Sequence, residues 1–287
     1  VAARLREAHP DLEVEEVVIR TLGDEILERA IHDVGGKGIF VKEIEEALLA
    51  GRVDAAVHSL KELQGDLPEG LVLGGVLPRE APWDVLVSRG GESIRGLPPG
   101  SRVGTSSLRR KAQLRRYRRD LDVVDMRGNV DTRLRKVAEG EVDGAILAAA
   151  GLNRLGHGER ITESLAPELM LPAVAQGAIG VEIREEDGET AALIGALDDL
   201  PTRRAVEAER AVMVRLEGGC KVPVAAFAEM RRGRLLLKAL VVSLDGARIV
   251  EGEEEGPPEA GPRMGDSLGA RLLASGGAEI LAEIRDV

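Results

Sequence analysis

Cysteine and aromatic residues are scarce in this 287-residue chain, which has one cysteine and four aromatic side chains. The single cysteine, Cys220, cannot form a disulfide within the chain. No apolar run approaches the roughly 20 residues that span a bilayer, and no export signal opens the chain. These absences predict a cytoplasmic protein that does not bind membranes, although the chain begins with Val1 rather than Met. A metal site is not predicted, because the four histidines lack the spacing of ligands.

Leu, Val, Ile and Ala must therefore form the core, and 35 glycines suit a compact α/β protein. Strands are predicted at 13–21, 53–57, 71–77, 83–88, 101–104, 122–126, 143–150 and 178–183. Helices are predicted at 1–8, 40–50, 108–119 and 130–138. This alternation is typical of mainly parallel sheets.

The last third of the chain changes character and predicts a separate α+β module. A helix at 202–216 precedes strands at 224–228, 235–242 and 248–252, and a helix at 267–284 closes the module. Hairpin turns are expected at Arg232-Gly233 and Asp245-Gly246, and the acidic run 251–255 is expected to be a solvated loop. We expect three domains, at 1–77 with 178–197, at 83–172, and at 200–287.

Charge is distributed unevenly along the chain. The net charge is −11, but twelve basic and only four acidic residues lie between Arg102 and Lys136. Arginine binds carboxylates and phosphates through two parallel hydrogen bonds. A polyanionic ligand is therefore plausible, and Arg115, Arg116, Arg118 and Arg119 are interpreted as solvated surface.

Cys220 follows Gly218 and Gly219 and precedes Pro223. Small neighbours leave room beside the sulfur, and a thiolate is a good nucleophile, so this thiol could carry a covalent group. The alternative is a small buried hydrophobic residue.

Three further motifs are candidates for chemistry. The glycine loop at 34–38 lacks the GxxxxGK(S/T) spacing of a nucleotide-binding loop, so it either offers Lys37 to an anion or forms a plain turn. The segment 104–110 places hydroxyls and two arginines at a helix start, where anions bind. The segment 58–62 follows a buried strand, so Glu62 could act in an α/β crevice or simply pair with Lys61 on the surface.

Taken together, these segments resemble the hydroxymethylbilane synthase family, also called porphobilinogen deaminase, along the whole chain. The matching segments, in the order of the family, are VGGKGIFVKEIE, DAAVHSLKE, VGTSSLRR, MRGNVDTRL, AILAAAGLNRLG, LPAVAQGAIG and ERAVMVRLEGGCKVP.

The resemblance implies an α/β fold, with two domains like type II periplasmic binding proteins, mixed sheets and a C-terminal α+β domain. It implies a monomeric transferase that carries a dipyrromethane cofactor on Cys220 through a thioether. Four porphobilinogen molecules would be added head to tail with loss of ammonia, and the linear tetrapyrrole would then be released by hydrolysis.

The resemblance also implies the site. Glu62 would be the catalytic carboxylate. The cofactor would be bound by Cys220, Lys61, Ser59, Thr105, Ser107, Arg109, Arg110, Arg127 and Gly128. The substrate would be bound by Arg133, Arg154, Gln176 and Lys37.

The chain departs from the family at several points. Glu62 stands where the family has aspartate in its HSxKD motif, and Asp33 stands where lysine is frequent. Asp24 is the next candidate for the catalytic carboxylate. An N-terminal strand of the family is not in this sequence, so it is either missing from the protein, which would damage the active site, or trimmed from this sequence.

Two other classes of protein share parts of this pattern. A non-catalytic anion receptor would use the crevice and the arginines, but would not need the thiol. A nucleic-acid-binding protein would use the arginines as a phosphate stripe, which the acidic net charge and the few aromatics disfavour.

Overall fold

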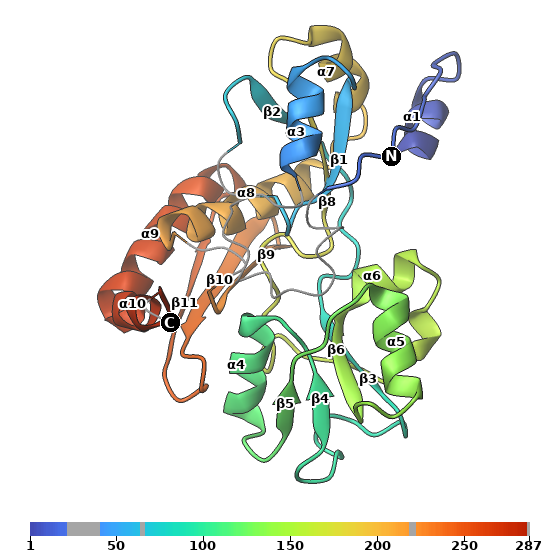
Figure 1. The fold of residues 1–287 in the computed structure, drawn as a ribbon. Helices are drawn as coiled ribbons and strands as arrows, with labels where there is room; N and C mark the ends of the chain where they lie inside the picture. The colour runs from blue at the N-terminus through green and yellow to red at the C-terminus, as the bar shows by residue number, and fades with distance from the viewer. Residues whose placement is uncertain (22–40, 64–66, 218–221, 286–287) are drawn as a thin grey trace. The chain divides into compact units, whose positions relative to one another are not determined.

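A computed structural model of the chain describes residues 1–21, 41–63, 67–217 and 222–285 (Figure 1). The chain divides into two compact units, one formed by 1–79 with 178–204 and the other by 80–177 with 205–287. The division into three domains stays a prediction, with the second and third predicted domains falling largely in the second unit.

The first unit is built on a three-stranded sheet in the order β1-β8-β2, in which both pairings are antiparallel. Its strands are β1 (Ala55–Ser59), β2 (Leu71–Val76) and β8 (Ile179–Arg184), and its helices are α1 (Ala2–Ala8), α3 (Lys42–Leu49) and α7 (Gly188–Gly195). Val181 and Ile183 of β8 pack with Ile194 of α7 and Leu5 of α1 in the core of this unit. The apolar positions of β8 therefore explain its central place in the sheet.

The predicted strand at 13–21 is wrong. These residues are described, but they form no strand, and Val18 is 89% exposed. Alternating apolar residues suit one face of a sheet, but a strand also needs a hydrogen-bonding neighbour, and no described segment pairs with this one.

The second unit contains a five-stranded sheet in the order β5-β4-β6-β3-β7. Its strands are β3 (Asp84–Ser88), β4 (Arg102–Gly104), β5 (Asp122–Val124), β6 (Gly144–Ala148) and β7 (Glu163–Ser164). Only β5, β4 and β6 are parallel, whereas β3 runs antiparallel to both of its neighbours. The expectation of mainly parallel sheets is thus corrected to mixed sheets, because α4 (Leu108–Tyr117) and α5 (Val130–Ala138) provide crossovers only between β4, β5 and β6.

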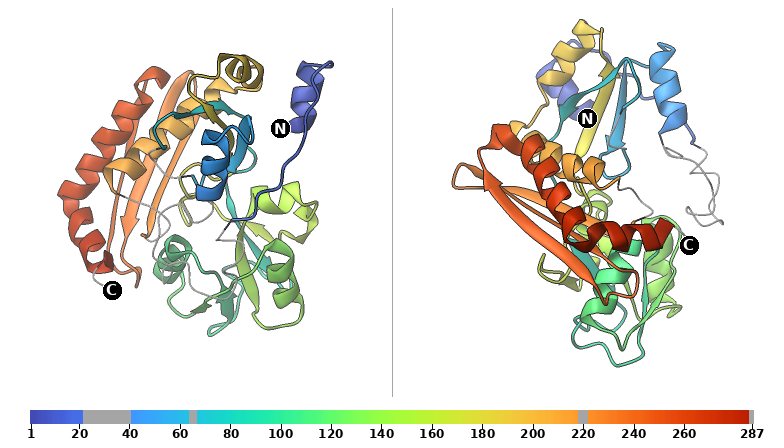
Figure 2. Two further views of the ribbon diagram at one scale, coloured as in Figure 1. Left: turned by 45° about the horizontal axis from the view of Figure 1, so that its top comes forward. Right: turned by 90° about the vertical axis from the view of Figure 1, so that its left-hand side faces the viewer.

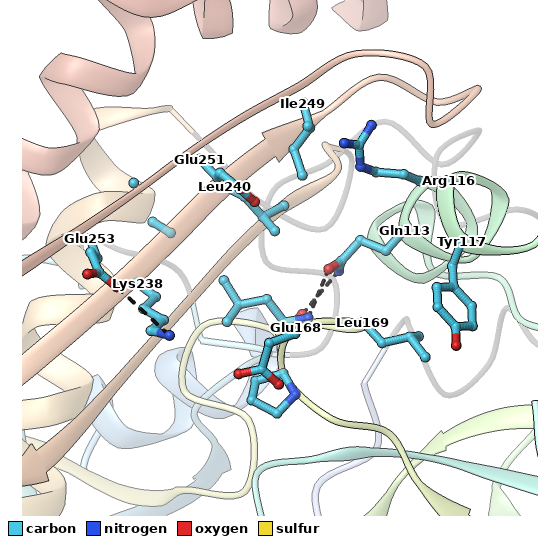
Figure 3. Close-up of a pocket in the computed structure, with 14 residues that line it drawn as sticks. Gln113, Arg116, Tyr117, Glu168, Leu169, Lys238, Leu240, Ile249, Glu251 and Glu253 are labelled. Atoms are coloured by element: carbon cyan, nitrogen blue, oxygen red, sulfur yellow. Dashed lines mark hydrogen bonds and ion pairs between the residues drawn. The ribbon is translucent and has the colours of Figure 1, made fainter.

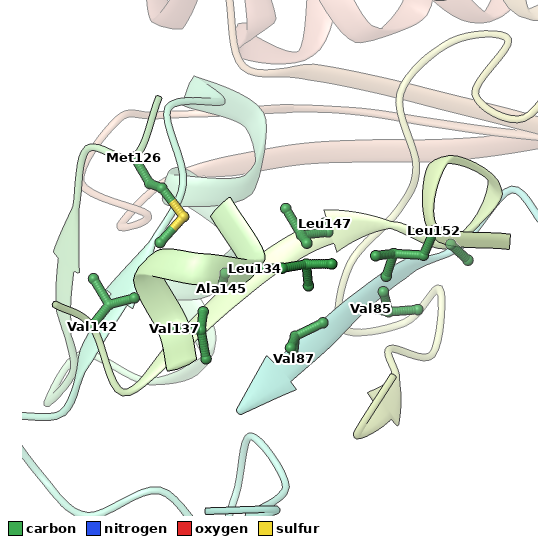
Figure 4. Close-up of a cluster of buried hydrophobic side chains, with 10 residues drawn as sticks. Val85, Val87, Met126, Leu134, Val137, Val142, Ala145, Leu147 and Leu152 are labelled. Atoms are coloured by element: carbon green, nitrogen blue, oxygen red, sulfur yellow. The ribbon is translucent and has the colours of Figure 1, made fainter. Parts of the chain in front are cut away.

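Both faces of this sheet are buried, which the two-residue period of β3 explains. Val85 and Val87 face a cluster that includes Leu134 of α5 and Leu152 of α6 (Ala149–Arg154), as Figure 4 shows. Leu86, between them, belongs to the cluster on the opposite face. Val85, Leu86 and Val87, which follow Asp84, therefore form a short apolar run that is buried on both faces of the sheet.

The remainder of the second unit is the predicted α+β module. The antiparallel strands β9 (Val224–Arg231), β10 (Arg234–Val242) and β11 (Ile249–Gly256) form a sheet in the order β11-β10-β9. Its helices are α8 (Leu200–Arg215), α9 (Gly261–Leu272) and α10 (Ala278–Arg285), with a π-helical segment at Leu273–Gly277. Figure 2 shows α9 and α10 along one side of this sheet. On the other face, Phe227 and Leu240 pack with Ala112 of α4.

The predicted acidic loop at 251–255 is wrong, because these residues lie in β11. Glu251, Glu253 and Glu255 alternate to the exposed side of the strand. Arg234 pairs with Glu255 from the neighbouring strand at 2.7 Å. Cross-strand pairing of this kind stabilises an acidic strand that composition alone assigns to a loop.

Candidate functional site

The second unit contains a buried charged cluster centred on Asp84, the first residue of β3. The Asp84 side chain has no exposed surface. Its Oδ2 accepts a hydrogen bond from Nη1 of Arg109 at 2.7 Å, and its Oδ1 accepts one from Nε of Arg110 at 2.9 Å. Gln176 adds a third hydrogen bond, from its Nε2 to Oδ1 at 3.0 Å. The structure therefore brings Arg109, Arg110 and Gln176, all predicted site residues, onto one carboxylate.

The two arginines determine the charge state of Asp84. Burial alone would raise the pKa of this carboxyl, but the neighbouring Arg109 and Arg110, with hydrogen bonds from Arg109 and Gln176, lower its pKa to about 2. Asp84 is therefore ionised at neutral pH. A fully buried carboxylate with two guanidinium partners and a side-chain amide is electrostatically satisfied.

Sequence reasoning missed Asp84, because it placed this residue only within the predicted strand 83–88 and gave it no role. A signal was present, since this aspartate begins an otherwise apolar strand, and such a residue is buried only when it is paired. The sequence predicts that anions bind at the start of α4, and the structure shows that one such anion, Asp84, is supplied by the protein itself.

The start of α4 is organised by the predicted hydroxyls. Thr105 directly follows β4 and is buried, and its Oγ1 accepts a hydrogen bond from the Ser107 backbone N–H at 3.3 Å. Ser107 is the N-cap, and its Oγ accepts from the N–H of Arg110 at 3.4 Å. Capping by these hydroxyls fixes the first turn of the helix and thus the bases of both arginine side chains.

Beyond that helix, two predicted arginines bind backbone carbonyls. Arg133 donates from Nε to the carbonyl of Gly128 at 2.8 Å, just before α5. Arg154, at the end of α6, donates from Nη2 to the carbonyl of Gly177 at 2.7 Å, and desolvation lowers its pKa. Arg127, also predicted, is half-buried in the loop that contains Gly128.

The first unit holds the predicted catalytic turn. Ser59 ends β1, and its carbonyl accepts a hydrogen bond from the N–H of Glu62 at 2.9 Å, which closes a tight turn. Lys61 Nζ lies 3.8 Å from Glu62 Oε1, and both side chains are about one-third exposed. The surface ion pair that was the alternative interpretation of Glu62 is therefore present. An ion pair and a catalytic role are compatible, because exposed pairs are weak.

A buried histidine–carboxylate pair connects β1, the strand that ends at Ser59, to β8. His58 Nε2 lies 2.9 Å from Glu182 Oε2 across β1 and β8, and neither side chain is more than 3% exposed. The pKa of Glu45, on α3, is raised mainly by burial and further by the negative charge of Glu182. The pair links the strand that carries the predicted catalytic turn to the centre of its sheet.

Several predicted residues cannot be placed. Cys220, Lys37 and the alternative carboxylate Asp24 lie outside the described residues. Within the described part of the chain, no group of three or more His, Cys, Asp or Glu side chains could hold a metal ion. No helix in that part is long and apolar enough to cross a membrane.

Two arginines depart from their interpretation as solvated surface. Arg115 is half-buried and donates from Nη1 to the carbonyl of Leu244 at 2.9 Å. The Arg118 side chain is only 16% exposed and donates to the carbonyls of Ile94 and Leu97 and to Asp120. Carbonyl capping, which sequence patterns do not reveal, explains its burial.

A cavity of about 760 Å³ in the second unit contains none of the predicted site residues. Its walls come from α4, from the loop before Leu171 and from β10 and β11 (Figure 3). Gln113, on one wall, exchanges two hydrogen bonds with the Leu171 backbone, and Lys238 pairs with Glu253 at 3.9 Å on another. Because none of the predicted site residues lines it, this cavity is distinct from the cluster that Arg109 and Arg110 form around Asp84.

Comparison with known proteins matches two family models in sequence order. The model described as "Porphobilinogen deaminase, dipyromethane cofactor binding domain" covers residues 1–192, and "Porphobilinogen deaminase, C-terminal domain" covers residues 203–274. A porphobilinogen deaminase of Desulforudis audaxviator is 52% identical over 285 residues, covering 99% of this chain and 92% of the relative. One of Syntrophobacter fumaroxidans is 49% identical over 284 residues, with 99% and 92% covered.

Similar solved structures include YhfZ from Shigella flexneri, with 23% identity, a TM-score of 0.30, and 60% of this chain and 73% of that chain covered. A TRAP periplasmic solute binding protein from Pseudomonas putida with bound D-glucuronate has 11% identity, a TM-score of 0.35, and 60% and 65% covered. TM-scores this low do not define the fold, which is given instead by the sheet topology. That topology is α/β with mixed sheets and a C-terminal α+β module, as the resemblance implies.

Proposed function

Because the chain belongs to the porphobilinogen deaminase family, we propose that it is a hydroxymethylbilane synthase, a transferase of tetrapyrrole biosynthesis. It joins four porphobilinogen molecules head to tail onto a dipyrromethane primer, loses ammonia at each addition, and releases the linear tetrapyrrole by hydrolysis. The observation that carries this proposal is the match of both family domains, in order, with a relative 52% identical over 99% of the chain.

The primer is held by a thioether to Cys220, the only cysteine of the chain. When bound, the dipyrromethane cofactor supplies the pyrrole ring to which porphobilinogen is joined. The donor set of the second unit fits such a group, because each ring carries two carboxylates and two buried guanidiniums share one protein carboxylate there. Arginine forks recognise carboxylates with both charge and geometry.

The proposed ligands divide between the two units. Those in the second unit are Thr105, Ser107, Arg109, Arg110, Arg127 and Gly128 for the cofactor, and Arg133, Arg154 and Gln176 for the substrate. Ser59 and Lys61 in the first unit, with Lys37, complete the set. Hydroxyls and backbone N–H groups at the capped start of α4 orient carboxylates there, and the arginines supply most of the binding energy.

Glu62 acts as the catalytic carboxylate. Loss of ammonia from porphobilinogen makes the substrate electrophilic, and attack on it by a pyrrole develops positive charge near the ring N–H. A carboxylate beside that nitrogen stabilises the charge as it forms, whereas the arginines alone would destabilise it. The turn between Ser59 and Glu62 fixes the backbone from which this carboxylate extends.

The enzyme is proposed to act as a monomer in the cytoplasm, without nucleic acid or membrane partners. The family resemblance supports the monomer. Burial of Arg109 and Arg110, with the carbonyl bonds of Arg118, counts against an exposed phosphate stripe on α4. A nucleic-acid-binding role therefore has little support.

Intact-protein mass spectrometry tests the proposal directly. The purified chain should carry an adduct equal to two linked porphobilinogen-derived rings, and peptide mapping should place it on Cys220. With porphobilinogen added, the protein should release ammonia and form heavier adducts in single-ring steps. An unmodified thiol and no ammonia release would refute the assignment.

A further inference from the structure

Two titratable side chains that the proposed mechanism does not use meet inside the first unit. Nε2 of His58, on β1, lies 2.9 Å from Oε2 of Glu182, on β8, and the two side chains are 3% and 0% exposed. The strand register explains the contact, because His58 stands opposite Gly180 and Glu182 is the diagonal neighbour on the same face. A Cβ at Gly180 would collide with Leu60, so this part of the sheet is closely packed.

The buried pair is not fully satisfied. Oε1 of Glu182 is buried and has no hydrogen-bond partner in the part of the chain that the structure describes. Glu45 of α3 adds a second carboxylate, whose pKa is raised first by burial and then by the charge of Glu182. A partly satisfied buried polar pair is less favourable than two apolar side chains of similar volume. Stability alone therefore does not explain these two residue types.

The place of His58 in the chain offers another explanation. Ser59 follows it, and the carbonyl of Ser59 closes the turn by accepting the N–H of Glu62 at 2.9 Å. Leu60, inside this turn, is fully buried and donates its N–H to the carbonyl of Ala178, just before β8, at 3.1 Å. The turn is thus tied to the β8 segment at two points, through the side chain of His58 and through the backbone of Leu60.

We propose that His58 and Glu182 are positioning residues for Glu62, the proposed catalytic carboxylate. Their hydrogen bond fixes the end of β1 against β8, and the turn carries that position to the backbone of Glu62. This inference rests on the proposed function. It assigns neither residue a contact with substrate or cofactor.

The end of β1 depends on this bond because β1 is an edge strand. Among the described strands, β8 is its only neighbour, so the strand is held from one side. Val57, on the opposite face from His58, is 50% exposed and adds little packing there. A displacement of about 1 Å at a catalytic group can lower a rate on the order of 100-fold, so a loosely held turn would be costly.

Replacing both members of the pair by apolar residues separates positioning from stability. His58→Leu/Glu182→Met removes the buried polar atoms, so the thermal midpoint, followed by circular dichroism, should equal or exceed that of the unsubstituted chain. The rate of the first ring addition, measured by mass spectrometry of quenched reactions, should nevertheless fall about tenfold. The KM for porphobilinogen should stay within about twofold, because the proposed substrate ligands Arg133 and Arg154 belong to the second unit.

A conservative variant and a second background test whether the pair acts through Glu62. Glu182→Gln keeps the shape of the side chain and one hydrogen bond to the ring, so its rate should recover to about threefold below that of the unsubstituted chain. In a Glu62→Gln background, neither pair variant should slow ring addition further, because the carboxylate that the pair positions is already absent.

Asp187→Ala is the matched control at the other end of β8. Asp187 caps α7 by accepting the N–H of Thr190, and it pairs with Arg184 of β8 at 2.7 Å. Its replacement should lower the thermal midpoint without changing the rate of ring addition, because neither interaction reaches the turn at Ser59.

A folded double variant that adds rings at the unsubstituted rate would overturn the inference. Equal slowing by the pair variants with and without the Glu62→Gln change would also overturn it, because the loss would then be structural. If the double variant fails to fold, Glu182→Gln decides through the same two comparisons. An unsubstituted chain with no adduct and no ammonia release would instead refute the proposed function.

Discussion

Lys61 Nζ lies 3.8 Å from Glu62 Oε1, in a turn where both side chains keep about one-third of their surface exposed. A partly exposed ion pair of this kind contributes at most about 1 kcal/mol to stability. Glu62 is therefore not required to hold the first unit together. Substitutions at this position should report on chemistry rather than on folding.

Glu62→Gln should keep the cofactor but slow elongation by about 100-fold or more, because a neutral amide cannot stabilise developing positive charge. Single-turnover assays with porphobilinogen, followed by mass spectrometry of the adducts, measure this. Glu62→Asp is the matched control, because it retains the charge and restores the family's side chain. An unchanged rate in Glu62→Gln would move the catalytic carboxylate elsewhere, with Asp24 the next candidate.

Cys220→Ser should abolish the thioether adduct, since no other thiol is available in the chain. The variant should fold normally, with the same thermal midpoint as a sample of the unsubstituted chain from which the cofactor is absent. Peptide mapping and ammonia release are the two measurements. Full turnover in this variant would show that Cys220 is not the attachment point.

Most of the regular structure was predictable from local patterns. The predicted helix at 130–138 coincides with α5, and the hairpin turn at Arg232-Gly233 has the positive φ angles, 49° and 79°, that its sequence suggests. Both depend on signals within a few residues, namely an Asn129 N-cap for the helix and a glycine for the turn.

The failures share a physical cause, which is dependence on distant partners. Segment 13–21 has the alternation of a strand but no described neighbour to pair with, whereas 251–255 has the composition of a loop but pairs along β10. Asp84 is a further example, because its partners lie 25, 26 and 92 residues away. Local patterns carry no information about such pairings.

Asp84 should also make stability depend on pH in the acidic range. Its pKa is about 2 in the folded protein against a usual value of 3.8, so its contribution is complete above about pH 4 and is lost as pH falls toward 2. This shift corresponds to about 2 kcal/mol of free energy of unfolding. Urea unfolding of Asp84→Asn at several pH values should show a stability deficit that shrinks from pH 4 to pH 2. A deficit that stays constant over this range would contradict the assigned pKa.

Gly177, the last residue of the segment 80–177, is sterically constrained, and Gly100 is its matched unconstrained control. Both have positive φ angles, 87° and 81°, so alanine is strained at either position. A Cβ at Gly177 would lie 2.3 Å from the carbonyl oxygen of Glu80, whereas one at Gly100 would have no neighbour within 4 Å. Gly100→Ala should therefore cost about 1 kcal/mol of unfolding free energy, the backbone term alone.

Gly177→Ala should cost roughly 2 kcal/mol more, because backbone atoms must move to relieve the contact. The Gly177 carbonyl also accepts hydrogen bonds from Arg154 and from the N–H of Glu80, so this movement should weaken the hold on a proposed substrate ligand. Denaturant unfolding measures the first effect, and the KM for porphobilinogen measures the second. Equal losses of stability in the two variants would show that the Glu80 carbonyl yields without cost, and would remove the argument that this contact fixes Arg154.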